Sequence, residues 1–256
     1  MKNFPLALQL VRRDIAGRYR GSILGMAWSF INPVLMLSVY TFVFGMVFRA
    51  RWGMTGNRLD FAMTLFSGLI VFNLFSECLT RAPHLILSNV NYVKKVVFPL
   101  EILPWVSLGS ALFHAGISLF VLFAFMIFSG HHVFWTFFLI PLILLPMLPM
   151  ILGFSWLLAS VGVFVRDVGQ FVGMAMTVLL FMSPVFYPAS ALPASVRPYL
   201  FLNPLTFVIE QTRGALFDGM APDWKSYLVY FLASLALSWA GYFWFRKTRH
   251  GFADVL

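Results

Sequence analysis

Long apolar runs separated by short polar breaks dominate this sequence. Each run reaches or approaches the roughly 20 residues that an α-helix needs to cross the hydrocarbon core of a bilayer. Prolines, glycines and charged residues mark the breaks between the runs. The pattern predicts an all-α membrane protein, a single transmembrane domain over 1–256, whose six transmembrane helices lie near 26–48, 61–79, 103–128, 134–164, 169–187 and 227–245.

Composition and charge support this prediction. The chain is 61% hydrophobic and 11% charged, whereas soluble domains are about 45–50% apolar. Between Lys95 and Arg166 the only charged side chain is Glu101, so this stretch must hold two spans. The formal net charge of +9 comes from basic residues between apolar runs rather than on one face, and we expect no nucleic-acid partner. Most of the basic residues lie in segments that are cytoplasmic if the N-terminus is cytoplasmic. Because cytoplasmic loops retain lysine and arginine, we expect both termini in the cytoplasm.

The first 22 residues have the pattern of an amphipathic helix lying in the membrane interface. Apolar side chains recur there every three or four positions while arginines project elsewhere. The apolar positions are Phe4, Leu8, Val11, Ile15 and Tyr19. The alternative is a charge cluster that only directs membrane insertion.

Motifs for catalysis are missing from the sequence. No lysine follows a glycine, which excludes the G-x-x-x-x-G-K-[ST] phosphate-binding loop. The sequence contains neither H-E-x-x-H nor G-x-S-x-G. His131 and His132 are interpreted as polar loop residues, and His114, inside a span, as a partner of a neighbouring helix. We therefore expect no enzyme activity, no bound cofactor and no metal.

Aromatic and polar residues share one face of the first span. Trp28, Asn32, Tyr40 and Phe44 lie on a row of positions four apart. Rings with hydrogen-bonding groups suit a sliding sugar chain, but the same face could also simply pack the bundle. We interpret these residues as the lining of a substrate channel. The channel prediction also includes Thr177 and Phe181 of the fifth span.

The segment 188–224 is rich in proline yet remains apolar. Proline forbids one continuous helix, and we predict short helices that re-enter the membrane and act as an extracellular gate. Asn203 and Pro204 have the pattern of a helix start, and Gly214 or Gly219 could end that helix. Glu210 and Arg213 could pair on it, or form a solvated ion pair of little energetic value. The predicted gate residues are Pro188, Pro193, Arg197, Pro204, Glu210 and Arg213.

Four motifs, in order, resemble a known family. They are "RYRGSILGMAWSFINPVLMLSVYTFVFG", "NYVKKVVFPLEILP", "VFVRDVGQFVG" and "SPVFYPASALPASVRPYLFLNPLTFVIEQTRGALFDG". The chain resembles, over nearly its whole length, the permease subunits of ABC transporters that export O-antigen, capsule or teichoic-acid chains. The resemblance implies a homodimer with two separate ATPase subunits that bind the ATP. It also implies a lipid-linked, undecaprenyl-type polysaccharide substrate, membrane lipid surroundings and a bacterial inner-membrane location.

The same resemblance implies a role for the cytoplasmic segment 80–98. In this family a coupling helix between the second and third spans docks on the ATPase, and it maps here to about 81–96. The residues expected to couple are Arg81, His84, Asn91, Lys94 and Lys95. Two alternatives stay open: a drug or lipid exporter of the same superfamily, and a secondary transporter or lipid-modifying membrane enzyme. The last two would need ionisable groups at mid-span, which are nearly missing.

Overall fold

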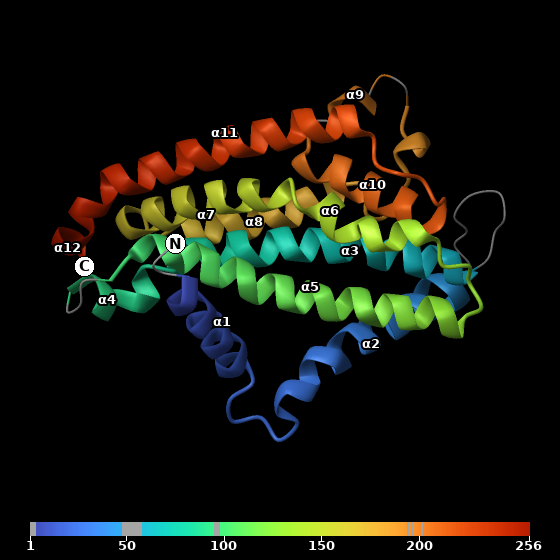
Figure 1. Ribbon diagram of the computed structural model, residues 1–256, viewed down its shortest axis with the longest axis horizontal. Helices are drawn as coiled ribbons and strands as arrows, with labels where there is room; N and C mark the ends of the chain where they lie inside the picture. Colours follow the sequence, from blue (N-terminus) through green and yellow to red (C-terminus); the bar gives the residue numbers. More distant parts are fainter. Residues whose placement is uncertain (1–3, 48–57, 95–97, 194, 196, 201) are drawn as a thin grey trace.

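The protein is an elongated bundle of helices packed side by side (Figure 1). The computed structural model describes residues 4–47, 58–94, 98–193, 195, 197–200 and 202–256. Within these ranges every regular element is helical, as the apolar pattern predicts. The longer helices are α1 Phe4–Arg18, α2 Trp28–Tyr40, α3 Arg58–Arg81, α5 Leu103–Phe128, α7 Met147–Phe164, α8 Val168–Met182, α10 Pro204–Phe217 and α11 Trp224–Thr248. The shorter ones are α4 Val90–Lys94, α6 Ile140–Leu144, α9 Arg197–Leu200 and α12 Phe252–Val255.

Five helical stretches among the described residues are long and apolar enough to cross a membrane. They are Gly25–Phe44, Leu59–His84, Leu100–Phe128, Trp135–Phe164 and Trp224–Val255. They correspond to five of the six predicted spans.

The predicted fifth span is present as a shorter apolar helix, α8. Its 15 residues extend about 22 Å, less than the roughly 30 Å of a hydrocarbon core. The predicted end at 187 is wrong, because Ser183 takes an extended backbone conformation with φ −88° and ψ 149°. Pro184 follows directly, and the residue before a proline disfavours the helical conformation.

Proline also divides the predicted fourth span. The 3₁₀ turn Trp135–Leu139 leads into α6, which carries a proline in its first turn, and Pro146 separates α6 from α7. The last span starts at Trp224, earlier than the apolar run indicates. Its N-cap is Asp223, whose carboxylate accepts the Lys225 backbone N–H at 3.2 Å.

Helix α3 is the centre of the bundle. All side chains from Phe61 to Phe72 are buried, and the helix packs against α5, α7, α8 and α10. Helices α7 and α11 form the most extensive helix pair. Their backbones meet at Gly153 and Gly241, where a Cβ atom on either glycine would collide with the backbone of the other helix.

Both chain ends lie at one end of the bundle, next to α4 and α12 (Figure 1). The C-terminal α12 packs against α4 and α7, and its buried Phe252 lies between Phe164 and Phe245, with ring centroids 5.9 and 5.5 Å away. The helices α6, α9 and α10 gather at the opposite end.

The amphipathic N-terminal segment is a helix, α1, that packs against α5. Leu10 and Ile15 are buried, while Phe4 and Leu8 are 71% and 45% exposed. The helix stops at Arg18 rather than at 22, and Gly21 follows with a φ of +87°, a conformation that glycine adopts at little cost. This turn redirects the chain into α2 and positions the candidate site.

Candidate functional site

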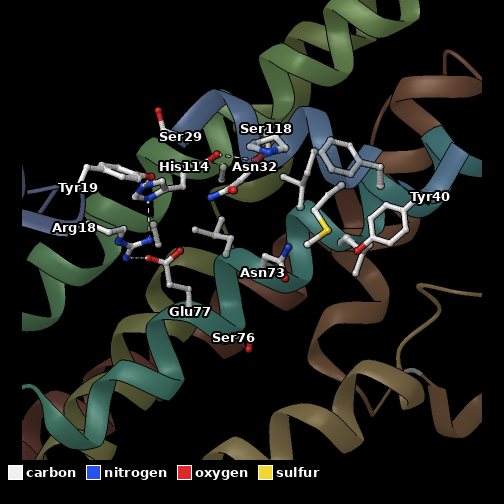
Figure 2. A pocket seen from close by; sticks show the side chains of 18 residues that line it. Arg18, Tyr19, Ser29, Asn32, Tyr40, Asn73, Ser76, Glu77, His114 and Ser118 are labelled. Atoms are coloured by element: carbon white, nitrogen blue, oxygen red, sulfur yellow. Dashed lines mark hydrogen bonds and ion pairs between the residues drawn. The ribbon is translucent and has the colours of Figure 1, made fainter. Parts of the chain in front are cut away.

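A cavity of about 620 Å³ lies among α2, α3 and α5, at the C-terminal end of α1 (Figure 2). Its walls combine apolar side chains such as Met36 and Leu69 with many polar ones. The polar and ionisable lining residues are Arg18, Tyr19, Ser29, Asn32, Tyr40, Asn73, Ser76, Glu77, His114 and Ser118. A polar cavity inside an apolar bundle is costly to maintain and marks the best candidate for a functional site.

Four charged residues join α1 to the last turns of α3 at one end of the cavity. Arg18 forms an ion pair with Glu77, and the Glu77 carboxylate also lies 3.7 Å from Arg81 Nη1. Arg81 Nη2 in turn donates to Asp14 Oδ1 at 2.7 Å. Two arginines therefore meet two carboxylates, and the cluster as a whole is electrically balanced.

The interaction with Arg81 changes the acidity of Asp14. Partial burial disfavours the carboxylate, but the hydrogen bond and positive charge of Arg81 outweigh it, so the pKa of Asp14 lies below its ordinary value of 3.8. Asp14 is thus ionised at neutral pH and holds α1 against α3.

His114 is hydrogen-bonded on both ring nitrogens, as the sequence interpretation expected. Its Nδ1 lies 2.8 Å from the Ser110 carbonyl oxygen and its Nε2 lies 2.8 Å from the Tyr19 hydroxyl. A carbonyl oxygen only accepts, so Nδ1 carries the proton and Nε2 accepts from Tyr19. The bond ties the turn after α1 to the middle of α5.

Amide and hydroxyl groups line the part of the cavity beyond the charged cluster. Asn73 is exposed although the neighbouring turns of α3 are buried, and Asn32 faces the same cavity from α2. The Ser118 hydroxyl donates to the His114 carbonyl at 2.9 Å, which leaves its oxygen able to accept. This lining offers neutral donors and acceptors, which suits a hydroxyl-bearing ligand without net charge.

The cavity brings together only some of the predicted channel residues. Asn32 and Tyr40 line it. Trp28 does not, and its indole N–H donates to Ser22 Oγ at 2.9 Å. Phe44 packs against Phe61, with ring centroids 5.3 Å apart.

The two channel residues predicted on α8 lie outside this cavity. Thr177 is exposed and donates to the carbonyl of Gly173 at 3.1 Å. Phe181 is 64% exposed and stacks on Phe186 at 5.7 Å. Their proposed contact with substrate stays a prediction.

Between the end of α3 and Lys94, the described part of the predicted coupling segment folds as three short helical turns rather than one helix. These are Ala82–His84, Leu87–Asn89 and α4. Pro83 stands in the first turn of its element, as expected. Its backbone lies so close to Gly162 of α7 that no Cβ atom would fit there, and this tight contact favours a compact turn over a regular helix.

The predicted coupling residues lie along this segment. Arg81 belongs to the charged cluster, while the exposed His84 packs its ring against Gly169 at the start of α8. Asn91 is exposed on α4. Lys94 is the last residue of α4, and its side chain, like the whole of Lys95, lies outside the described residues.

The predicted gate helix is present as α10, with the predicted start. Asn203 is its N-cap and accepts the Leu205 backbone N–H at 2.9 Å, and Pro204 occupies the first turn. The helix ends before Gly219, which has a φ of +65°, and the Met220 N–H bonds to the Gly214 carbonyl at 2.9 Å.

Arg213 is a buried connector, and the interpretation of a solvated ion pair is wrong. The residue is 6% exposed, and Glu210 Oε1 lies 3.8 Å from its Nη1. Its guanidinium donates to three backbone carbonyls: Thr64 at 3.3 Å, Pro184 at 2.5 Å and Val185 at 2.8 Å. Arg213 thus links α10 to α3 and to the chain that follows α8.

The other predicted gate residues lie at the same end of the molecule. Pro188 is half-buried and lines a hollow of about 420 Å³ together with Glu210 and Arg213. Pro193 is exposed. Arg197, also exposed, donates to the Leu192 carbonyl at 3.1 Å.

Two further long-range contacts between ionisable side chains, like those of the charged cluster, were not predicted from the sequence. His131 Nε2 lies 2.5 Å from Asp60 Oδ1, at the N-terminal end of α3. Glu101 pairs with Arg249 at the other end of the bundle. Their partners are 71 and 148 positions apart, so no local pattern points to either; the isolation of Glu101 among apolar residues is the only hint that it has a partner.

Comparisons with known proteins agree with the membrane architecture. The family model described as ABC-2 type transporter matches residues 6–217. The chain is 29% identical over 253 residues to the O-antigen export system permease protein RfbA of Myxococcus xanthus, covering 98% of this chain and 95% of that protein. It is 25% identical over 255 residues to the protein of the same name from Klebsiella pneumoniae, covering 99% and 95%.

A further relative is named for the transport of a different polysaccharide. The polysialic acid transport protein KpsM of Escherichia coli is 26% identical over 215 residues, covering 82% of this chain and 80% of that protein. These names describe transport subunits, in agreement with the prediction that the chain is not an enzyme. Because the family model spans most of its length, the chain belongs to the ABC-2 type transporter family.

Proposed function

We propose that this chain is the permease subunit of an ABC exporter that moves a lipid-linked polysaccharide outward across a bacterial inner membrane. The observation that carries the proposal is the polar, charge-balanced cavity among α2, α3 and α5. The names of the relatives, which describe O-antigen export and polysialic acid transport, support a glycan as the cargo.

The chemistry of the cavity favours a sugar over other membrane cargo. Asn32, Asn73 and Ser118 offer neutral hydrogen-bonding groups, and the ring of Tyr40 offers a face on which sugar C–H groups can stack. A cationic drug would be held best by an uncompensated carboxylate, but the Glu77 carboxylate is already paired with Arg18 and Arg81. A neutral sugar chain can exchange its hydroxyl partners step by step along such a lining.

The energy would come from a separate ATPase subunit, since the sequence has no phosphate-binding loop. We place its docking surface at the end of the bundle formed by residues 82–94 and α12, which pack together there. The cluster of Asp14, Arg81, Glu77 and Arg18 starts directly beside this surface and ends at the cavity. A movement of the docking surface therefore reaches the cavity wall through ion pairs and α1. This assignment places both termini in the cytoplasm.

A homodimer would enclose the pathway, each subunit contributing half of the wall. Helices α2 and α8 present large exposed apolar residues suited to this role, among them Phe30, Val34, Met174 and Phe181. With α8 counted as the short fifth helix, each subunit would cross the membrane six times.

Helix α10 would be the re-entrant gate at the outer end of the pathway. Arg213 and Ile209 of α10 lie beside Gly68 of α3, ten positions after the start of that helix at Arg58, a depth of about 15 Å. The helix thus runs along the outer half of α3, where protein covers its backbone groups.

The location of the glycan in cells that lack the chain tests this function. We expect the completed polysaccharide to accumulate inside, and the wild-type chain to restore it to the surface. Replacing Asn32 and Asn73 together with leucine should lower export while folded protein, measured by fluorescence size exclusion, stays at the wild-type level. Normal surface glycan without the chain would refute the function.

A further inference from the structure

A second hollow, of about 810 Å³, lies between the start of α5 and the second half of α11 and extends to α7. It shares no lining residue with the cavity described above. Its walls include Glu101, Trp105, Trp156, Trp239, Tyr242 and Arg249. We infer that this groove binds one anionic bilayer phospholipid, with the headgroup phosphate at Arg249 and the acyl chains along Trp239.

A row of aromatic rings forms the apolar part of the groove. Trp156 is buried, and its ring centroid lies 6.2 Å from Trp105 and 5.1 Å from Tyr242, both in edge contacts. Its indole N–H donates to the Glu101 carbonyl at 3.1 Å, which fixes the ring. Trp105 and Trp239 flank this row and are 51% and 71% exposed. Trp105 lies near the start of α5, where exposed tryptophans are typical of side chains that contact lipid at the membrane interface, and Trp239 lies deeper, in the middle of its span.

The charges at the end of the groove favour an anion. Glu101 pairs with Arg249, but the carboxylate side chain is 17% exposed and the arginine side chain 40%. The accessible charge is therefore the guanidinium. Arg246 lies over the Tyr242 ring at 6.0 Å, and Lys247 follows it on the surface. Arg249 contacts the covered acid, and Arg246 and Lys247 precede it on the same helix end; basic residues at the cytoplasmic membrane surface attract anionic lipid headgroups.

The length of the groove fits one leaflet of a bilayer. Leu235 and Arg249, at its two ends, are fourteen positions apart on a nearly continuous helix, a distance of about 21 Å. Half of a hydrocarbon core is about 15 Å, and the headgroup region accounts for the rest. A phosphate beside Arg249 thus places acyl chains against Trp239 and Leu235. Unlike the cavity, these walls contain no amide side chain and a single serine with which a glycan could exchange hydrogen bonds.

Native mass spectrometry of the full chain, released from nanodiscs of equal parts phosphatidylglycerol and phosphatidylcholine, tests the inference. We expect the wild type to retain phosphatidylglycerol in preference. The double variant Trp105→Ala/Trp239→Ala should bind phosphatidylglycerol roughly tenfold more weakly than the wild type. Trp224→Ala is the matched control, because Trp224 is 54% exposed at the opposite end of α11, and should retain the lipid like the wild type.

A substitution that removes one positive charge separates headgroup recognition from general lipid contact. Arg246→Gln should weaken phosphatidylglycerol binding by about fivefold, as expected for one basic residue at the membrane surface, and leave phosphatidylcholine unchanged. Equal retention of the two lipids by the wild type would overturn the inference. Lipid retention by the double tryptophan variant at the wild-type level would also overturn it. A third refuting result is a double variant that becomes monomeric while the wild type holds no lipid, because the groove would then be an interface between copies of the chain.

Discussion

Replacing Arg213 with methionine should destabilise the link between α10 and the rest of the bundle. The guanidinium donates to the carbonyls of Thr64, Pro184 and Val185, and methionine can donate to none of them. The side chain is also packed against Gly68, where a Cβ atom would lie 2.9 Å from Arg213 Nη2. The site therefore has little room to rearrange around a different side chain.

The contacts set the size of the effect. Hydrogen bonds to a charged group contribute about 1.5–3 kcal/mol each, and removing one member of a buried ionic group costs about 3–5 kcal/mol. Two of the three acceptors are within 2.8 Å, so we expect a loss of about 3–4 kcal/mol. For a chain of this size that loss lowers Tm by roughly 6–16 °C.

Thermal unfolding of the detergent-solubilised chain, followed by fluorescence size exclusion, measures this loss. Arg197→Met is the matched control, since Arg197 is exposed and donates to the Leu192 carbonyl; its Tm should change by less than about 2 °C. Arg213→Lys should fall between the two, because one ammonium group cannot reach all three carbonyls. If Arg213→Met and Arg197→Met unfold at the same temperature, the connector role of Arg213 is wrong.

Two further substitutions test local features. Asp14→Asn should lower Tm by about 2–4 °C at neutral pH, the effect of losing an ion pair worth about 1 kcal/mol. Because the pKa of Asp14 is lowered in the folded state, the stabilisation by Asp14 is present above the ordinary value of 3.8 and is lost as the pH falls below it. The Tm values of the wild type and of Asp14→Asn should therefore converge in acid. A Tm difference that persists in acid would contradict the assignment. Asn203→Ala should cost about 1 kcal/mol through loss of the N-cap of α10, measured by the same unfolding assay, and an unchanged Tm would show that the cap does not stabilise the helix.

Local patterns predicted the elements better than they predicted their connections. The start of α10 follows from Asn203 and Pro204, because capping depends on neighbouring residues. The premature end of α8 could also have been derived from Pro184, but the apolar run beyond it masked the break. Helix ends inside apolar sequence are difficult to place, since hydrophobicity alone does not stop a helix.

Pairings between distant residues could not be predicted in this way. Arg213 stands one turn after Glu210, a spacing typical of an exposed pair, but tertiary packing buries it and gives it three carbonyl partners. The cavity depends on the angle between α2 and α3, which the sequence pattern does not specify. Only Asn32 and Tyr40 among the predicted channel residues share it.

Glycan transport into sealed inside-out proteoliposomes tests the central claim most directly. The chain is reconstituted with a candidate ABC ATPase and with the lipid-linked polysaccharide, and a membrane-impermeant glycosidase measures how much glycan becomes protected in the lumen. The account predicts protection that requires ATP, the ATPase and this chain together, with no nucleotide turnover by the chain alone. Equal protection without the chain, or none when the chain and an active ATPase are assembled, would contradict it.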